Sequence, residues 1–450
     1  MVKNKNKTSL AIISEEETLT YQQLIDKVLL LKKKLNKINK QKKLIAIACG
    51  KNIDFICWQI AVNYSKNVFL PLNGDFNQRF FEILSLSVPD IIILPNNLSP
   101  EEKKLFKNSY QLIEQLTYSS VWLKTKNDKI KRKFSISKAD YLIYSSGSTG
   151  FPKGILLNIK SLINVVNNQS KIFNINNKSI VGWLLNPGFD ASLSDIYTAF
   201  YQGATLCIIN KPIIQLKKII EIINYHKITH LDLPPTLLNI ISPDKLPYLK
   251  TIIFGGEPTN QSTINKWLLS GKNLFNAYGP TEACICSSIK KFSHNIKNNN
   301  IGQPLKKYKY AITDNGELLI SSPNLAIGYT DHNLTKQRFF IKNKIRWYKT
   351  NDLVKTITDD YYYLGRLDRQ FKYNGVLICP EELEEFVKNH GAVQAKCLLE
   401  NDKIKLFYVG EINEDILKNK INNYFPQFMR PHFYQKINSF ALNQSGKTAI

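Results

Sequence analysis

Short apolar runs alternate with amphipathic stretches from about Leu44 to Glu282. The runs are rich in branched and aromatic residues and predict strands: "LIAIAC", "VFLPL", "DIIIL", "YLIYS", "VGWLL", "ATLCII", "HLDLPP" and "TIIFGG". Between several of them, stretches such as "FICWQIAVNYSK" and "IIQLKKIIEIINYHK" have helical periodicity. Because strands that alternate with helices are typical of parallel sheets covered by helices, we expect an α/β fold with mostly parallel sheets.

The pattern changes after Glu282. "SHNIKNNNIGQP" is a polar loop, and "YKYAITDNGELLISSP" predicts a hairpin with its turn at Asp314-Asn315-Gly316. From about Asp368 the chain predicts a small α+β segment, with helices at "EELEEFVKNH" and "EDILKNKINNYF" and strands at "AKCLLE" and "IKLFYVG". A chain of 450 residues exceeds one ordinary core, so we expect at least two domains.

Composition narrows the class of protein. The hydrophobic share of 43% excludes wholesale disorder, and no apolar run reaches the length of a membrane span. The start, "MVKNKNKTSLAIISEEE", has too short an apolar patch for a signal peptide. The seven cysteines show no CxxC pairing and mostly stand in apolar runs, as buried reduced thiols do. We therefore expect a cytoplasmic enzyme.

The net charge of +25 raises the question of nucleic-acid binding. Only seven of the 61 basic residues are Arg, and the Lys residues are spread along the whole chain with abundant Asn and Ile. Nucleic-acid readers usually concentrate Arg in patches with aromatic residues between them. A general bias of the composition towards Lys, Asn and Ile therefore explains the charge better than nucleic-acid binding does. A basic surface would also attract an acidic protein partner.

The stretch "YSSGSTGFPKG", residues 144–154, predicts a strand that enters a flexible loop. Such a loop offers backbone N–H groups, hydroxyls and one cation to a polyanion. Gly/Ser-rich turns are also common linkers, so this stretch alone leaves both interpretations open. The later "SGKT", residues 445–448, is not a Walker A loop, because that motif needs Gly where Ala441 stands and a helix afterwards.

Seven motifs occur in a fixed order: "YSSGSTGFPKG", "FDAS" (189–192), "NAYGPTE" (276–282), "GELLISSPNLAIGY" (316–329), "YKTNDL" (348–353), "GRLDRQFKYNG" (365–375) and "SGKT" (445–448). Together they resemble the adenylate-forming (AMP-binding) superfamily. Within it they are similar to the amino-acid adenylation domains of nonribosomal peptide synthetases and to the D-alanine–carrier protein ligases. The resemblance covers almost the entire chain. It implies a large N-terminal domain over residues 1–367, a small mobile C-terminal domain over residues 368–450, and a hinge at Asp368.

The resemblance implies two half-reactions, in which ATP and a carboxylate give an acyl-adenylate and a thiol then takes the acyl group. Because nucleophile and triphosphate are both anionic, the protein must supply charge neutralisation and alignment. The implied catalytic residues are Lys447, Lys153, Thr281 and Lys372, and Glu282 is the implied Mg²⁺ carboxylate. The implied ATP-binding residues are Ser145, Ser146, Gly147, Ser148, Thr149, Gly150, Asn276, Ala277, Tyr278, Gly279, Asp352 and Arg366.

The motif "FDAS" bears most directly on the substrate. In the amino-acid-activating branch of the superfamily, the Asp of this motif pairs with the α-ammonium of the substrate, and Asp190 occupies that place. The alternative is an ordinary helix N-cap, because a helical stretch follows Asp190. The remaining substrate positions implied by the resemblance are Ala191, Ser194, Asp232, Ile253, Gly255, Ala277, Ile285 and Cys286.

Asp232 is the unusual member of that set, since a second buried carboxylate is costly unless it is paired. It slightly favours a substrate with a polar or cationic side chain, such as a diamino acid, over a small substrate such as alanine or serine. "GGxS", the carrier attachment motif, does not follow the adenylation motifs. We therefore expect a ligase that loads a separate carrier protein, with no nucleic-acid or membrane partner.

Three positions depart from the family pattern. Asn351 replaces a usual Gly, Asn374 a usual Arg, and Cys379 a common Glu. Asn tolerates the left-handed backbone region, so the turn at Asn351 can survive. The alternatives to an amino-acid ligase are an acyl- or aryl-CoA ligase of the same fold and a catalytically degraded homologue that only binds its ligands. Asp190 argues against the first, and the retained Lys153, Glu282 and Lys447 argue against the second.

Overall fold

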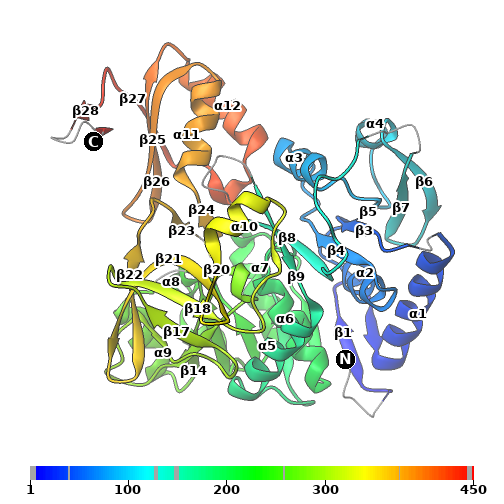
Figure 1. Cartoon of the computed structure of the whole chain (residues 1–450). Coiled ribbons are helices and arrows are strands. Elements are labelled where there is room, and N and C mark those ends of the chain that lie inside the picture. Colours follow the sequence, from blue (N-terminus) through cyan, green and yellow to red (C-terminus); the bar gives the residue numbers. More distant parts are fainter. Residues whose placement is uncertain are drawn as a thin grey trace.

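The computed structural model describes residues 7–38, 41–125, 130–145, 152–256, 259–373, 376–442 and 448–449. Two eight-stranded sheets, a six-stranded sheet and a smaller C-terminal α+β unit make up this part of the chain (Figure 1). The expected α/β architecture is confirmed, but the sheets are mixed: only the first sheet is mostly parallel, and the six-stranded sheet is antiparallel throughout. No helix among the described residues is long and apolar enough to cross a membrane.

The first sheet carries the strands that end at the predicted substrate positions. Its order is β15-β14-β13-β12-β10-β11-β1-β2, and the six strands from β14 to β1 are parallel. The strands are β15 (Ser288–Lys291), β14 (Asn273–Tyr278), β13 (Thr251–Gly255), β12 (His230–Asp232), β10 (Ile180–Trp183), β11 (Thr205–Ile208), β1 (Leu10–Ile13) and β2 (Thr18–Thr20). The α-helices along this part of the chain are α1 (Tyr21–Ile38), α5 (Ile159–Ile172), α6 (Ala191–Gln202), α7 (Leu216–Tyr225), α8 (Pro235–Ile240) and α9 (Gln261–Leu269), and the short 3₁₀ turns are η1 (Ile213–Gln215), η2 (Pro243–Lys245) and η3 (Thr281–Ala283).

The second sheet has the order β19-β9-β8-β4-β3-β5-β7-β6, with a parallel centre from β8 to β5 and antiparallel strands on both sides. Its strands are β19 (Gly328–Tyr329), β9 (Lys153–Leu157), β8 (Tyr141–Ser145), β4 (Val68–Pro71), β3 (Leu44–Ile47), β5 (Ile91–Pro95), β7 (Ser119–Lys124) and β6 (Tyr110–Gln115). The helices here are α2 (Ile53–Tyr64), α3 (Gln78–Ser87) and α4 (Pro100–Lys107).

Strand β3 shows why these sheets form from continuous apolar runs. Ile45 and Ile47 belong to the largest buried cluster, which also contains residues of the first sheet and of α1, α2, α5 and α6. Leu44 and Ala46 belong to a separate cluster on the opposite face, together with residues of α3 and α4. Successive side chains of a strand point to opposite faces, so a strand buried on both faces needs apolar residues throughout.

The third sheet follows the change of pattern after Glu282. Its order is β16-β22-β21-β18-β17, with β20 paired to β21. Its strands are β16 (Asn300–Gly302), β17 (Lys309–Ile312), β18 (Glu317–Ser321), β20 (Phe339–Lys342), β21 (Ile345–Ile357) and β22 (Asp360–Arg366), with the helix α10 (His332–Arg338) before β20. The predicted hairpin is confirmed by the antiparallel pair β17–β18, and Gly316 in its turn has φ +86°.

The C-terminal unit has its own buried cluster, which extends from Ile378 to Met429. Its elements are β23 (Phe371–Tyr373), β24 (Val376–Ile378), α11 (Pro380–Asn389), β25 (Ala392–Glu400), β26 (Lys403–Gly410), α12 (Glu414–Tyr424), η4 (Gln427–Met429), β27 (Phe433–Lys436), β28 (Ala441–Leu442) and β29 (Thr448–Ala449). The two helices and two strands expected here are all present. The domain boundary between residues 367 and 368 stays a prediction.

The cysteines agree with the expectation of reduced thiols, since all seven are free and buried. The N-terminal hairpin is a feature that the apolar pattern alone did not predict. Strand β1 pairs in parallel with β11 and so extends the first sheet, while the polar "SEEE" forms the connection to β2. A short strand added to a sheet in this way comes from tertiary pairing rather than from local propensity.

Candidate functional site

The Gly/Ser-rich stretch connects two antiparallel strands. Strand β8 ends at Ser145 and β9 begins at Lys153, and these two residues are register partners. Ser146, Gly147, Ser148, Thr149 and Gly150, which lie between them, are outside the described residues. The Oγ atom of Ser145 is buried and has no hydrogen-bond partner within the described part of the chain. A buried hydroxyl without a partner is suited to a polar ligand.

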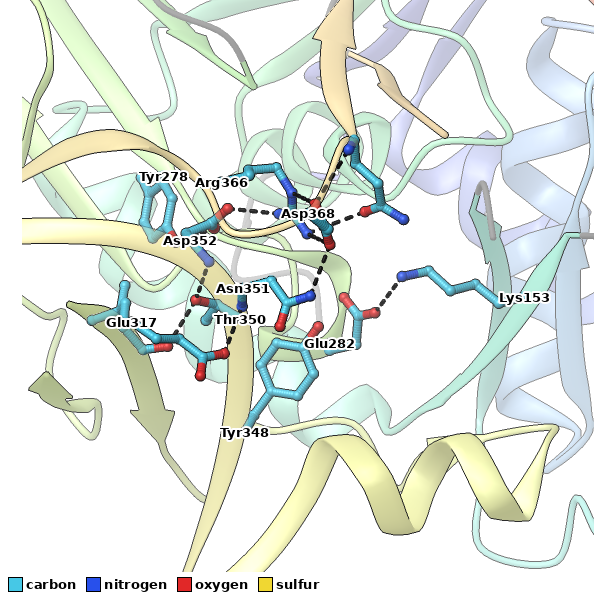
Figure 2. Close-up of polar contacts among 12 residues, drawn as sticks. Lys153, Tyr278, Glu282, Glu317, Tyr348, Thr350, Asn351, Asp352, Arg366 and Asp368 are labelled. Atoms are coloured by element: carbon cyan, nitrogen blue, oxygen red, sulfur yellow. Dashed lines mark hydrogen bonds and ion pairs between the residues drawn. The ribbon is translucent and has the colours of Figure 1, made fainter. Parts of the chain in front are cut away.

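Lys153 and Glu282 form an ion pair across the site. The Nζ atom of Lys153 lies 3.1 Å from Oε1 of Glu282, which stands in the 3₁₀ turn η3 (Figure 2). The hydroxyl of Tyr329 donates to the same oxygen at 2.5 Å. Burial opposes ionisation of Glu282, but the Lys153 charge and the Tyr329 hydroxyl outweigh it and lower the pKa of this carboxyl. Glu282 therefore stays a carboxylate although it is only 3% exposed.

Asp352 has a partner on each of its carboxylate oxygens. Tyr278 donates its hydroxyl to Oδ2 at 2.5 Å, and Arg366 donates Nη1 to Oδ1 at 2.6 Å (Figure 2). Tyr278 is the last residue of β14, whereas Asp352 and Arg366 are register partners on β21 and β22. The structure thus brings together three residues that the sequence placed near the nucleotide.

Arg366 extends this cluster to the predicted hinge. Its Nε and Nη2 atoms donate to the two carboxylate oxygens of Asp368 at 2.7 and 2.8 Å. The side-chain amide of Asn351 donates to Asp368 Oδ2 at 2.8 Å. Asn351 has φ +60°, so the left-handed conformation expected at this position is confirmed. The departure from Gly adds a hydrogen bond that Gly cannot make.

The predicted substrate positions lie along the carboxyl ends of adjacent strands. Asp232 is the register partner of Ile253, and Gly255 is the register partner of Ala277, across β12, β13 and β14. Ligands of parallel α/β sheets bind at this edge. Ala191 and Ser194 stand in the first turns of α6, and Ile285 and Cys286 follow η3.

A buried amide connects two of these positions. The Ser194 hydroxyl donates to Oε1 of Gln169 at 3.0 Å, and Nε2 of Gln169 donates to the Cys286 sulfur at 3.2 Å. Gln169 comes from α5 and is 1% exposed. No motif marked it, because its position is defined only by the packing of α5 against α6.

Ile285 is held in a conformation that branched residues rarely adopt. Its φ is +69°, that of the preceding Cys284 is +66°, and the Cys286 N–H donates to the Cys284 carbonyl at 2.9 Å. A three-residue turn with positive φ at a branched residue costs about 1–3 kcal/mol. Such strain is common where surrounding structure fixes a binding position.

Asp190 is not a helix cap. It stands at the N-cap position of α6, but its φ and ψ are −64° and −32° and its side chain makes no capping hydrogen bond. Its Oδ2 atom is buried without a hydrogen-bond partner in the described residues. Burial raises the pKa of Asp190 to about 6, against the influence of Thr281 and of backbone N–H groups. The N-cap alternative is therefore wrong.

The other predicted residues are distributed as follows. Thr281 stands in η3 beside Glu282, and Gly279 lies against the loop that follows, where an added Cβ would stand 2.5 Å from Cys286 Cα. Asn276 donates its side-chain amide to the Asn300 carbonyl at 3.0 Å.

Lys372 is in β23, with its side chain outside the described residues, as are Asn374, Gly375 and Lys447. Cys379 is buried and donates its thiol to Glu381 at 2.9 Å.

The donor set fits a magnesium ion bound largely through a substrate. No group of three or more His, Cys, Asp or Glu side chains within the described ranges is arranged to hold a metal. Mg²⁺ often takes only one or two carboxylates together with phosphate oxygens and waters, and Glu282 can supply one.

Two tyrosines belong to the site although the sequence did not single them out. Tyr329 bonds Glu282 and lies within 3.4 Å of the Tyr348 hydroxyl. Both tyrosines stand inside recognised motifs, "AIGY" and "YKTNDL", which is the signal that could have identified them. A cavity of about 400 Å³ lies elsewhere, on α9, and contains none of the predicted residues.

Comparison with known proteins supports this architecture. The model of the family described as "AMP-binding enzyme" matches residues 2–330, and the chain belongs to that family. Gramicidin S synthase 1 of Brevibacillus brevis is 27% identical over 99% of the chain, and tyrocidine synthase 1 of Brevibacillus parabrevis is 26% identical over 97%. The chain spans 43% of the length of each of these two relatives.

Solved structures show the same fold. The adenylation domain AlmE of Vibrio cholerae, in complex with glycyl-adenosine-5′-phosphate, has a TM-score of 0.83 at 21% identity, with 98% of this chain and 94% of that chain covered. An artificially fused adenylation–PCP di-domain from Klebsiella oxytoca, NpsA-ThdA, has a TM-score of 0.79 at 21% identity, with 96% and 91% covered. The adenylate-forming fold expected from the motifs is confirmed.

Proposed function

We propose that the protein activates an amino acid with ATP and then transfers it to a carrier protein. In the first step a carboxylate oxygen of the amino acid attacks the α-phosphorus, the bond to the bridging oxygen breaks, and pyrophosphate leaves. The observation that carries this proposal is Asp190, a buried carboxylate whose Oδ2 has no partner in the described residues and which does not cap its helix. An α-ammonium would satisfy it.

The nucleotide would bind between the two clusters described above. The loop from Ser145 to Lys153 would hold the phosphates, and Lys153 would leave Glu282 to meet the charge of the departing pyrophosphate. Thr281 would approach the α-phosphate, and Lys447 is assigned to the substrate carboxylate from the motif alone. A Mg²⁺ ion held by Glu282 would supply further charge neutralisation.

Asp352 is proposed as the ribose ligand and Tyr278 as the adenine contact. The hydroxyl of Tyr278 and the guanidinium of Arg366 already hold both carboxylate oxygens of Asp352. These bonds fix the rotamer of Asp352, and each oxygen retains a lone pair for a ribose hydroxyl. Asn276, Ala277 and Gly279 would lie at the edge of the base.

Transfer of the aminoacyl group is the second proposed step. A phosphopantetheine thiolate attacks the acyl carbon, a thioester forms, and AMP leaves with the electron pair of the mixed-anhydride bond. The relatives are peptide synthetases by name, and NpsA-ThdA joins an adenylation domain to a PCP. The net charge of +25 would steer an acidic carrier towards this chain. Asp368 is the proposed hinge for this step, and Lys372 and Gly375 are the proposed contacts.

Amino-acid-dependent ATP–pyrophosphate exchange tests the first step without a carrier. We expect at least one amino acid in a panel of proteinogenic, D- and diamino acids to support exchange. Asp190→Asn should raise the KM for that amino acid at least tenfold, because a charge-assisted pair is lost, and should leave the KM for ATP unchanged. Asp314→Asn, in an exposed hairpin turn, is the matched control.

An acyl- or aryl-CoA ligase is the competing function. Exchange supported only by carboxylic acids that lack an amino group would favour it and would overturn the role of Asp190. Loading assays with coenzyme A and with a phosphopantetheinylated acidic carrier then separate the two thiol acceptors. Nucleotide binding without exchange by any acid would favour a degraded homologue.

A further inference from the structure

The buried amide of Gln169 holds two of the proposed substrate positions in fixed orientations. Its Oε1 atom accepts from the Ser194 hydroxyl at 3.0 Å, and its Nε2 atom donates to the Cys286 sulfur at 3.2 Å. Gln169, Ser194 and Cys286 are all buried. A buried side-chain amide is costly unless both its ends are paired, and Ser194 and Cys286 supply the two partners.

This network lies next to Asp190. Ser194 follows Asp190 by four residues, and the backbone of Asp190 already has helical φ and ψ values, so the two side chains lie on one face of α6. The turn that carries Cys286 also meets Asp190: burial raises the pKa of Asp190, and a hydrogen bond from the Ile285 N–H opposes the shift. Ser194 and Cys286 are therefore neighbours of the carboxylate that is proposed to bind the α-ammonium.

The bond to Gln169 fixes what Ser194 can offer to a ligand. A serine hydroxyl has one proton and two lone pairs. The proton points to Oε1 of Gln169, so only lone pairs are left for a further partner. The bond from Nε2 to Cys286 holds the amide in this orientation. Any ligand group that bonds the Ser194 hydroxyl must therefore be a hydrogen-bond donor.

We propose that Gln169 is a positioning residue that determines specificity: it keeps Ser194 an acceptor, so the site selects an amino acid whose side chain donates a hydrogen bond. A hydroxyl or a carboxamide meets this requirement. A side chain without a donor would leave the buried Ser194 oxygen unpaired, which weakens binding. The inference rests on the proposed amino-acid activation and narrows its substrate class. Gln169 lies outside every motif and outside the substrate positions that the resemblance implies.

A purely structural role for Gln169 is the alternative, because its side chain also ties α5 to α6. A second glutamine makes such a tie. Gln202, the last residue of α6, donates Nε2 to the Ser170 hydroxyl of α5 at 2.8 Å. Within the described residues, neither of these two side chains bonds a proposed substrate position. Gln202 is therefore a matched control, because its replacement removes a bond between the same helices.

The test uses pairs of amino acids that are similar in shape and of which one member has a side-chain donor. ATP–pyrophosphate exchange is measured with threonine and valine, asparagine and leucine, and tyrosine and phenylalanine. We expect the natural chain to have the higher kcat/KM for the donating member of the pair that it uses best. Gln169→Met keeps the length of the side chain and loses both bonds, so it should lower this ratio about fivefold or more. Gln202→Met should leave the ratio unchanged.

A double-mutant comparison separates orientation of Ser194 from packing. Ser194→Ala removes the hydroxyl through which Gln169 acts and should lower the same ratio by a similar factor. Gln169→Met in the Ser194→Ala background should then cause no further change in the ratio, because its effect passes through Ser194. Independent effects of the two changes on the ratio would contradict the proposed positioning role.

Several other results would overturn the inference. These are a preference of the natural chain for the member without a donor, and exchange supported only by glycine or alanine; both would keep the proposed function. An equal loss with both members of a pair in Gln169→Met would show a structural amide. If that variant fails to fold, Ser194→Ala decides alone, and an unchanged ratio there is equally fatal. Absence of exchange with every amino acid would instead overturn the proposed function, and the inference with it.

Discussion

Asp190 is a carboxylate whose ionisation the fold opposes. Burial raises its pKa to about 6, and the charge of Glu282 acts in the same direction. Thr281 and the backbone N–H groups of Ala191 and Ile285 oppose the shift. Binding of an α-ammonium requires the ionised form, so a raised pKa makes binding fail as the pH falls through about 6.

We therefore expect the KM for the amino acid to be constant above about pH 7 and to rise roughly tenfold per pH unit below about pH 6. Exchange kinetics between pH 5 and pH 8 measure this, with the KM for ATP over the same range as the control. A KM for the amino acid that stays flat down to pH 5 would contradict the assignment of Asp190.

Asn351 offers a second test at the scale of one residue. Asn351→Gly keeps the left-handed backbone but removes the amide bond to Asp368. We expect the free energy of unfolding to fall by about 1 kcal/mol. With Asp368 as the hinge, we also expect aminoacyl transfer to become faster relative to adenylation, because one restraint on the hinge is gone.

The control for this change is Asn343→Gly, at an exposed residue with φ +52°. It makes the same replacement in the same backbone region and leaves the hinge intact. Urea unfolding gives the stability, and single-turnover loading of a carrier gives the transfer rate. Equal effects of the two variants would mean that the bond to Asp368 does not restrain the hinge.

Sequence reasoning located the residues that stand inside motifs, because such residues keep their order and spacing along the chain. It singled out Asp190 and Asp352 in this way, and it anticipated the left-handed backbone of Asn351, which the structure confirms. It missed Gln169, which meets the site only because α5 packs beside α6. A contact between helices is set by packing, and no local spacing reports it.

At the scale of elements, Gly255 shows that the packing of a sheet can require glycine at a position that the motifs assign to the substrate. An added Cβ at Gly255 would stand 2.2 Å from the Ala277 carbonyl oxygen on the neighbouring strand β14. Backbone atoms cannot yield as a flexible side chain does. We expect Gly255→Ala to lower the free energy of unfolding by about 2 kcal/mol or more without changing the order of preferred amino acids.

The matched control is Gly271→Asn, where no atom lies within 4 Å of the added Cβ and the φ of +75° suits Asn. Denaturant midpoints and the exchange panel are measured on both variants. A Gly255→Ala protein of full stability with a changed substrate preference would instead assign this glycine to the substrate.

Elements were predictable where the apolar pattern was long or the turn chemistry specific. Strands such as β3 and β13 are continuous apolar runs buried on both faces, and the hairpin at Gly316 carries the Asp-Asn-Gly signal. Strand β1, which lies between β11 and β2, was not predicted. Its four residues carry little periodic signal, and its pairing with β11 depends on a segment far away in the sequence.

At the scale of the whole molecule, the C-terminal unit is tied to the second sheet's helix α3. Helix α3 lies beside α12 (Figure 1). Arg79 of α3 forms an ion pair with Glu382 of α11, and Tyr424 of α12 donates its hydroxyl to Glu82, 342 positions away. The side chains of Arg79 and Glu382 are 11% and 1% exposed. A contact over such a distance in the sequence could not be predicted from local patterns.

Removal of one partner of a buried ion pair leaves the other charge uncompensated. We expect Glu382→Gln to lower the free energy of unfolding of the C-terminal unit by about 3 kcal/mol. In limited proteolysis, the C-terminal unit of this variant should be cleaved before the rest of the chain. Addition of Arg79→Met should restore part of that loss. The control on the same helix is Glu385→Gln, which breaks the exposed pair with Lys388 and should cost less than about 1 kcal/mol. Similar losses of unfolding free energy in Glu382→Gln and Glu385→Gln would contradict a stabilising role of the buried ion pair between Arg79 and Glu382.

Lys153 and Glu282 act as each other's counter-ions. If a phosphate binds Lys153 and no cation is present, Glu282 is left as a buried carboxylate without a counter-ion. If a divalent cation binds Glu282 and no phosphate is present, Lys153 is left as an ammonium without a counter-ion. When both ligands bind, Lys153 pairs with the phosphate and Glu282 with the cation, so neither side chain is left without a counter-ion. The consequence of the proposed binding mode is thermodynamic linkage: nucleotide and cation would strengthen one another's binding by the same factor.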